Sequence, residues 1–203
     1  IKYGLDRTIK LLETCENPHD KLKSIQIVGT NGKGSTASML ANVLIENGYT
    51  VGLYTSPHLV NINERIRINH KPISNKFMDS FIYRYKEKFI EQQSSFFEIM
   101  TVMALKYFES HNVDLAILET GLGGRLDSVT AAKSEIIVYT PIDIDHISIL
   151  GGSLKSIAHE KAGAISPSSK LIFSTEQHNI VYSILNEKAQ SVNNKILYDN
   201  AHQ

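Results

Sequence analysis

Apolar residues along the chain follow two patterns, short continuous runs and longer stretches with helical spacing. Short apolar runs that end in polar loops are typical of strands buried on both faces of a sheet. Apolar residues spaced three and four apart are typical of amphipathic helices. Because the two kinds of segment alternate from residue 24 onward, the pattern predicts an α/β fold, a mostly parallel sheet covered by helices on both faces.

The runs also place the individual elements. We expect a first strand that begins at Ile25. Further strands are predicted over residues 51–55, 113–118, 136–140, 170–174 and 195–198, with an irregular or edge strand within 61–73. We expect helices over residues 5–15, 36–47, 76–91, 96–110, 154–163 and 178–192. No internal repeat or low-complexity tract interrupts this order.

Two of the predicted helices carry a clear apolar stripe. In the helix over 36–47 the stripe consists of Met39, Leu40, Val43 and Leu44. In the helix over 76–91 it is aromatic, because Phe77, Phe81, Tyr85 and Phe89 recur every four residues. An aromatic stripe at this period is more often core packing than a ligand site.

The loop that follows the first strand carries the strongest chemical signal. It reads Gly29-Thr-Asn-Gly-Lys-Gly-Ser35 and leads into a helix. Glycines let backbone N–H groups turn toward a ligand, a helix N-terminus adds partial positive charge, and Lys33 adds a full charge. The usual P-loop pattern is not met, because Ile27 stands five residues before Gly32 and Gly34 separates Lys33 from Ser35. The stretch nevertheless predicts a polyphosphate site.

Three further predicted strands end in polar residues, namely Ser56, Glu119 and the pair Asp145-His146. In a parallel sheet these strand ends meet at one edge, where ligands bind. A hydroxyl, a carboxylate and an imidazole beside a phosphate loop suit a hard divalent cation, so we expect a magnesium nucleotide. Taken singly, Ser56 is typical of a turn and His146 of a structural histidine.

Two candidates close to these strand ends have ordinary alternatives. Arg125 and Asp127 follow a glycine-rich stretch, and they could form either a surface ion pair or part of a loop that closes on a ligand. Lys161 lies in a predicted helix, where a lysine is most often solvated. Spacing alone does not decide between these alternatives.

Composition narrows the class of protein. Of 203 residues, 42% are hydrophobic, and 21 basic residues balance 21 acidic ones. The length and composition predict one large soluble domain, and the neutral charge does not favour nucleic acid as a partner. No apolar run is long enough for a membrane span, and the single cysteine, Cys15, fits a reducing compartment. We therefore expect a cytoplasmic protein with no membrane partner.

Seven motifs together resemble a known family. In chain order they are Gly29–Ser35, Thr55-Ser-Pro-His-Leu59, Asn63-Glu-Arg-Ile66, Phe96-Phe-Glu98, Glu119-Thr-Gly-Leu-Gly-Gly-Arg-Leu-Asp127, Asp145-His146 and Glu160-Lys-Ala-Gly163. This set resembles folylpolyglutamate synthase, which is often bifunctional with dihydrofolate synthase, within the Mur ligase superfamily. The resemblance spans residues 4–165 and implies a P-loop nucleotide-binding domain like the central domain of Mur ligases.

The resemblance also implies roles for individual residues. The ATP phosphates would be held by Thr30, Asn31, Gly32, Lys33, Gly34 and Ser35. One Mg²⁺ would be bound by Ser56, Glu119 and His146, and a second by His146 with a carbamoylated Lys161. The catalytic residues would be Lys33, His146 and Lys161. The pterin substrate would be contacted by Ser95, Phe96, Phe97, Glu98, Leu126, Asp127 and Ser128.

The chemistry implied by the resemblance is ATP-driven amide formation, in which a folate or dihydropteroate carboxylate is activated as an acyl phosphate and captured by L-glutamate. Family members carry a C-terminal glutamate-ligase domain that we expect to be absent from this chain, so we treat residues 1–203 as the ATP-binding domain, an inactive and monomeric unit by itself. Ser128-Val-Thr departs from the family's usual Ala-Thr-Asn. A peptidoglycan-type Mur amino-acid ligase and a non-catalytic nucleotide-binding module remain alternatives.

Overall fold

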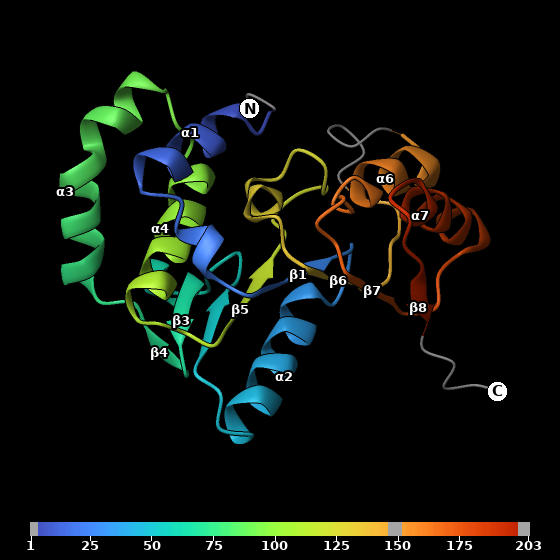
Figure 1. Ribbon diagram of the computed structural model, residues 1–203, viewed down its shortest axis with the longest axis horizontal. Coiled ribbons are helices and arrows are strands. Elements are labelled where there is room, and N and C mark those ends of the chain that lie inside the picture. Colours follow the sequence, from blue (N-terminus) through green and yellow to red (C-terminus); the bar gives the residue numbers. More distant parts are fainter. Residues whose placement is uncertain (1–3, 146–151, 199–203) are drawn as a thin grey trace.

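The computed structural model describes residues 4–145 and 152–198 and is built around an eight-stranded sheet (Figure 1). The strand order is β4-β3-β2-β5-β1-β6-β7-β8. The strands are β1 (Ser24–Val28), β2 (Val51–Tyr54), β3 (Ile66–Ile68), β4 (Lys71–Pro72), β5 (Leu115–Glu119), β6 (Ile136–Tyr139), β7 (Leu171–Ser174) and β8 (Ile196–Tyr198). All neighbouring pairs from β2 to β8 in this order are parallel, and the pairs β2–β3 and β3–β4 at one edge are antiparallel. The predicted α/β fold with a mostly parallel sheet is confirmed.

Among residues 4–145 and 152–198, the α-helices follow the predicted order. They are α1 (Asp6–Thr14), α2 (Lys33–Glu46), α3 (Asn75–Glu91), α4 (Phe96–Ser110), α6 (Leu154–Ala162) and α7 (Asn179–Ser191). The connections in the described part of the chain also contain the short 3-10 helices η1 (Pro18–Lys21), η2 (Ile62–Arg65) and η3 (Ser128–Ala132). Within the described residues, no helix is long and apolar enough to cross a membrane.

Helices cover both faces of the sheet, but unequally. On β1, Ile25 and Ile27 pack toward α2, whereas Val28 packs toward the layer that holds α6 and α7. Figure 1 shows α2 alone below the sheet, with α1, α3, α4, α6 and α7 above it. Because strand side chains alternate between faces, Leu171 and Phe173 on β7 point to the side of α2 and remain exposed.

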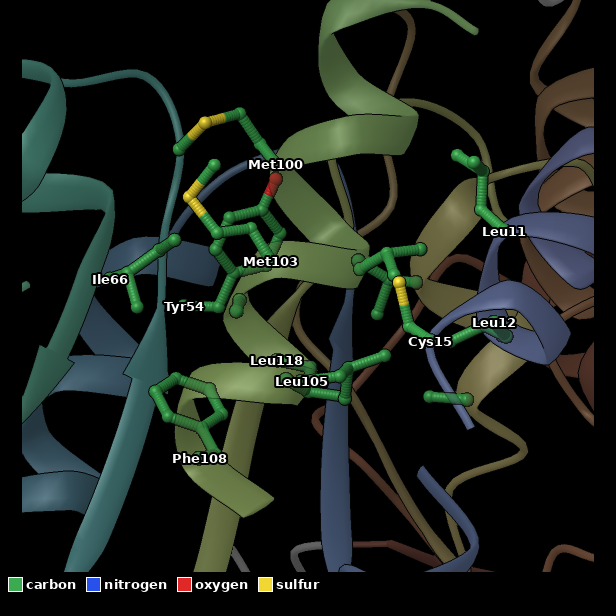
Figure 2. Packing of buried hydrophobic residues seen from close by; sticks show 14 of the residues in the cluster. Leu11, Leu12, Cys15, Tyr54, Ile66, Met100, Met103, Leu105, Phe108 and Leu118 are labelled. Atoms are coloured by element: carbon green, nitrogen blue, oxygen red, sulfur yellow. The ribbon is translucent and has the colours of Figure 1, made fainter. Parts of the chain in front are cut away.

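The largest hydrophobic cluster lies between the sheet and the layer of α1, α3 and α4 (Figure 2). The aromatic stripe of α3 contributes to it as predicted, because Phe81, Tyr85 and Phe89 are all buried there. Cys15 is also buried in this cluster as a free thiol, and burial raises its pKa to about 11. A thiol in this state is a packing residue and not a reactive group.

The predicted stripe of α2 is wrong in part. Met39 and Val43 are 60% and 59% exposed, and the side chains of α2 buried against the sheet are Ala37 and Ala41. Leu40 and Leu44 are partly buried and pack against the cluster that these alanines form with β1, β2 and β5. The small alanines let the helix lie close to β1 and β2, and the larger apolar residues flank that contact.

Other differences concern element boundaries. Helix α2 begins at Lys33, three residues before the predicted start, and β5 begins at Leu115, two residues after it. Residues 62–65 form η2, where a strand was predicted to begin. A capping box stabilises η2, because Asn61 and Glu64 each accept a hydrogen bond from the other's backbone.

The close approach of β2 and α4 gives a stability prediction. A Cβ atom at Gly52 would lie 2.6 Å from the ring of Phe108, which is fully buried. Gly52→Ala should therefore lower the free energy of unfolding by about 1–3 kcal/mol, measured by urea denaturation. In a Phe108→Leu background the alanine should cost less, because the smaller side chain leaves room. An equal cost in both backgrounds would contradict the proposed clash.

Candidate functional site

A cleft of about 680 Å³ opens at the carboxyl ends of the parallel strands. The loops after β1, β2, β5 and β6 all reach it, through Thr30 and Lys33, Ser56, Gly121 and Asp145. The remaining lining residues are Gly4, Pro57, Arg65, Ser95, Phe97, Glu98, Leu122, Leu126, Asp127, Ser128 and Glu160. The predicted meeting of four strand ends at one edge is therefore observed in the sheet order β2-β5-β1-β6.

The glycine loop exposes the N-terminus of α2. Gly32 adopts a left-handed conformation with φ of 80°, and no side chain in the described part of the chain caps the helix there. The N–H of Thr36 donates to the carbonyl of Gly32, so the N–H groups of the residues just before Thr36 have no partner within the helix. Lys33 Nζ donates to the carbonyl of Thr30 at 3.0 Å. The loop thus presents N–H groups and one ammonium group together.

The loop after β6 is tied to the glycine loop. Thr30 Oγ1 donates to the carbonyl of Asp143 at 2.9 Å and accepts from the Asp143 N–H at 3.0 Å. The N–H of Thr30 donates to the carbonyl of Pro141. Gln177, which follows β7, donates to the carbonyl of Thr140 and accepts from the N–H of Ile142. These bonds fix the position of the segment that leads to Asp145.

Glu119 ends β5 and is buried beside two other loops. Its Oε2 accepts from the N–H of Ser56 at 2.9 Å. A Cβ atom at Gly34 would lie 3.4 Å from both carboxylate oxygens, so the first turn of α2 lies directly against Glu119. Burial raises the pKa of Glu119, while the Ser56 N–H and the charges of Lys33 and Arg65 lower it. The structure thus brings Lys33, Ser56 and Glu119 together.

Lys161 joins the same group from α6, because its Nζ donates to the carbonyl of Gly29 at 2.6 Å. Its side chain is buried, so the alternative of a solvated helix residue is wrong. Burial, together with the nearby charge of Lys33, lowers the pKa of Lys161 to about 8. A neutral amine at this position is therefore accessible near physiological pH.

The predicted metal ligands are only partly within the described residues, since His146 lies outside them. Among residues 4–145 and 152–198, no group of three or more His, Cys, Asp and Glu side chains could hold a metal ion. Ser56 and Glu119 remain as a hydroxyl and a carboxylate beside the phosphate-type loop. Both are hard oxygen donors, and a Mg²⁺ ion that keeps several waters needs few protein ligands. The donor chemistry therefore fits magnesium.

Most residues predicted to contact the pterin line the cleft, but Phe96 does not. Its ring is half exposed and lies under the guanidinium of Arg65, 5.3 Å from ring centroid to Cζ. The first turn of α4 is held by Glu98, which accepts from the N–H of Ser95 at 2.6 Å and pairs with Arg7 at 2.7 Å. The Glu98 carboxylate is thus occupied by contacts that order this wall of the cleft.

Asp127 lies in the wall of the cleft formed by the loop after β5. It is buried and accepts from the N–H groups of Leu122 and Val129, and burial raises its pKa to about 6. The alternative of an Arg125–Asp127 ion pair is wrong, because Arg125 pairs with Glu160 at 3.1 Å. Asp127 instead orders the glycine-rich loop that follows β5.

Arg65 lines the cleft, although no role was predicted for it from the sequence. Its Nε donates to His58 Nδ1 at 2.8 Å, and the face of its guanidinium rests on Phe96. Arg65 follows the strand-end loop that carries Ser56 and belongs to the motif Asn63-Glu-Arg-Ile66. The direction of its side chain depends on η2 and on contacts with other parts of the chain. A charge oriented by two neighbours at a cleft is suited to an anionic ligand.

Comparison with known proteins agrees with this geometry. Residues 27–202 match the family model described as the Mur ligase middle domain. The chain belongs to the Mur ligase middle-domain family. It is 39% identical over 194 residues to the dihydrofolate synthase/folylpolyglutamate synthase of Bacillus subtilis, covering 92% of this chain and 45% of the relative. It is also 39% identical over 166 residues to the folylpolyglutamate synthase of Lacticaseibacillus casei, covering 78% and 39%. The resemblance found from the motifs is confirmed.

Solved structures agree as well. An FPGS–AMPPCP–folate complex superposes on this Mur ligase middle domain with a TM-score of 0.87 at 34% identity, covering 95% of this chain and 48% of the other. The Mycobacterium tuberculosis folylpolyglutamate synthase complexed with ADP and AMPPCP gives 0.89 at 33% identity, covering 98% and 47%. This chain therefore spans about half the length of the relatives that it matches.

The buried amine of Lys161 predicts a specific pH dependence. Because folding lowers its pKa from 10.5 to about 8, the unfolded chain binds more protons between these values. The cost of burying Lys161 is present below pH 8 and is relieved as pH rises toward 10.5. Relative to Lys161→Met, the free energy of unfolding of the unaltered chain should rise over this window by up to about 3 kcal/mol.

The measurement is urea denaturation at a series of pH values with a chelator present. Lys155→Met, an exposed site on the same helix, is the matched control and should show no such difference. The lowered pKa would be contradicted if the free energies of unfolding of the unaltered chain and Lys161→Met differ by a constant amount from pH 8 to 10.5.

Proposed function

We propose that this chain is the ATP-binding part of a ligase that joins L-glutamate to the carboxylate of a folate or of dihydropteroate through an acyl phosphate. The observation that carries the proposal is the convergence of Lys33, Ser56, Glu119 and Lys161 at one end of a single sheet. The relatives are named for folylpolyglutamate and dihydrofolate synthesis, which supports both substrate choices.

The ATP triphosphate would lie at the start of α2. The N–H groups at that helix end, together with those of the Thr30–Ser35 loop, suit phosphate oxygens. Lys33 Nζ would leave the carbonyl of Thr30 and contact the terminal phosphates, since a bound anion is a stronger acceptor than a carbonyl. Complexes of relatives with ADP and AMPPCP support this assignment.

Ser56 and Glu119 would hold a Mg²⁺ ion at the phosphates, with His146 as a further proposed ligand. When bound, the ion supplies charge neutralisation at the transferring phosphoryl group. Lys161 would serve a second metal site if its amine became a carbamate, which replaces a cation by an oxygen ligand. Reaction with CO₂ requires a neutral amine, and lowering the pKa of Lys161 from 10.5 to about 8 makes that form far more populated near neutral pH.

The reaction needs two anions to meet. An oxygen of the substrate carboxylate attacks the γ-phosphorus of ATP, and the bond to ADP breaks. The amine of glutamate then attacks the acyl carbon, loses a proton, and inorganic phosphate leaves. Lys33 neutralises charge on the phosphates, and Arg65 is suited to neutralise the substrate carboxylate because it faces the same cleft. The walls formed by residues 95–98 and 126–128 would hold the pterin.

Two alternatives make different predictions. A peptidoglycan-type Mur ligase would use a muramyl nucleotide in place of a folate, and a non-catalytic module would bind nucleotide without depending on the metal ligands. The sequence identity to folylpolyglutamate synthases supports the folate ligase over both of these alternatives. The cytoplasmic location, the monomeric state and the division into one ATP-binding domain and a further glutamate-ligase domain stay predictions.

The nucleotide site is tested by titrating residues 1–203 with Mg-ATP in a calorimeter. We expect weak binding that Lys33→Ala reduces at least tenfold, because one charge-assisted contact is lost. Glu119→Gln should remove the dependence of binding on Mg²⁺. Lys10→Ala, exposed on α1, is the control and should leave binding unchanged. Nucleotide binding that changes with neither Lys33→Ala nor Glu119→Gln would contradict the proposed nucleotide site. Glutamate-dependent phosphate release by this chain alone would refute the predicted domain division.

The role of Arg65 gives a separate test. Arg65→Gln should weaken folate binding about tenfold, equivalent to about 1.4 kcal/mol, because the carboxylate loses its charged partner. Binding is measured by calorimetry with Mg-AMPPCP present, and the nucleotide affinity itself should change little. Arg84→Gln on the exposed face of α3 is the matched control. Unchanged folate affinity in Arg65→Gln would exclude this role.

A further inference from the structure

A second cavity, of about 140 Å³, lies between α2 and the edge of the sheet formed by β2 and β3. It shares no lining residue with the cleft. Ser38 and Asn42 contribute from one face of α2, Leu53 from β2, and Arg67, Asn69 and His70 from β3 and the turn after it. None of the residues that line this cavity is acidic, and Arg67 carries its one permanent charge.

Arg67 is held in the wall of this cavity by the sheet. It pairs in register with Leu53, and its neighbour Ile66 packs into the core on the opposite face. The alternation of strand side chains therefore directs Arg67 to the side of α2. The strand backbone therefore sets the position of the Arg67 guanidinium.

The guanidinium of Arg67 is incompletely satisfied. Its Nε is buried and makes no hydrogen bond with any described residue. Its Nη2 makes only a long contact with Thr55 Oγ1, at 3.4 Å. A buried donor on a charged group that lacks an acceptor is costly, and a bound water or ion is one way in which such a donor is satisfied.

The other polar groups in the lining are suited to the same kind of ligand. Asn69 Oδ1 already accepts from the N–H of Val51 at 2.8 Å, which leaves the amide NH₂ of Asn69 as a donor. The hydroxyl of Ser38 and the amide of Asn42 can donate as well. The volume of about 140 Å³ exceeds that of several water molecules, each about 30 Å³ in the liquid, and accommodates a small ion.

We propose that this cavity binds a small oxyanion, a carboxylate or a phosphate, on the edge of the Arg67 guanidinium formed by Nε and Nη2. That edge presents two parallel N–H donors, which match two oxygens of either group. The ligand replaces the long contact to Thr55 and satisfies the buried Nε. This site is separate from the nucleotide site and does not depend on the proposed function.

The test is a nuclear magnetic resonance titration of the ¹⁵N-labelled chain. The Nε–H signal of Arg67, identified by its loss in Arg67→Gln, is followed while sodium phosphate or sodium acetate replaces sodium chloride at constant ionic strength. The experiment is run in a Lys33→Ala background, so that phosphate bound at the glycine loop does not interfere. We expect a saturable shift with a Kd on the order of 1 mM. The anion with the lower Kd shows whether the cavity prefers a phosphate or a carboxylate.

Two variants test whether the cavity is the site, with the amide signals of Val51 and Asn69 as the readout. Arg67→Gln should weaken binding at least tenfold. Ser38→Leu leaves Arg67 in place but fills the cavity from a helical position that accepts leucine well, and it should also weaken binding at least tenfold. The proposal is overturned if neither anion gives a saturable shift, or if binding persists in Ser38→Leu. If phosphate does not shift the amide signals of Gly32 and Gly34 in the unaltered chain, that result counts against the nucleotide site and not against this cavity.

Discussion

The parallel pairing of β1 with β5 on one side and β6 on the other is the constraint on which the site depends. Its register places Ile27 beside Glu119 and Val28 beside Tyr139, so that three chain segments leave the sheet at the same level. The glycine loop, the Glu119 carboxylate and the segment leading to Asp145 therefore start from adjacent positions. A one-residue slip would turn Glu119 to the other face of the sheet.

This geometry gathers ionisable groups that are unfavourable to bury. Glu119, Asp127 and Lys161 are all buried around the glycine loop, and the pKa of each is shifted toward its neutral form. Hydrogen bonds from Ser56, Leu122 and Val129, and to Gly29, offset part of the cost. Buried groups with shifted pKa values that line a cleft are typical of functional sites, because a fold without such a role would replace them with apolar residues.

Much of this arrangement could be predicted from the sequence because it depends on local patterns. Apolar runs predicted the strands, and the polar residues that end them predicted the edge at which Glu119 and Ser56 meet. The buried face of α2 could not be predicted, because Ala37 and Ala41 are selected by how closely the helix approaches the sheet.

The same limit applies to single side chains whose direction depends on distant partners. Arg65 is oriented by His58 and Phe96, and Phe96 is turned from the cleft by the start of α4. Lys161 could not be distinguished from a solvated lysine, because its partner is the carbonyl of Gly29, a residue far away along the chain. Such contacts are set by packing between elements, which hydrophobic periodicity does not encode.

The most direct test of the central claim is a crystal structure of this chain with AMPPCP and Mg²⁺. We expect phosphate density at the N-terminus of α2, Lys33 Nζ moved from the carbonyl of Thr30 to the phosphates, and a metal ion that contacts Ser56 and Glu119. A nucleotide bound away from these residues, or with its phosphates directed away from α2, would contradict that claim.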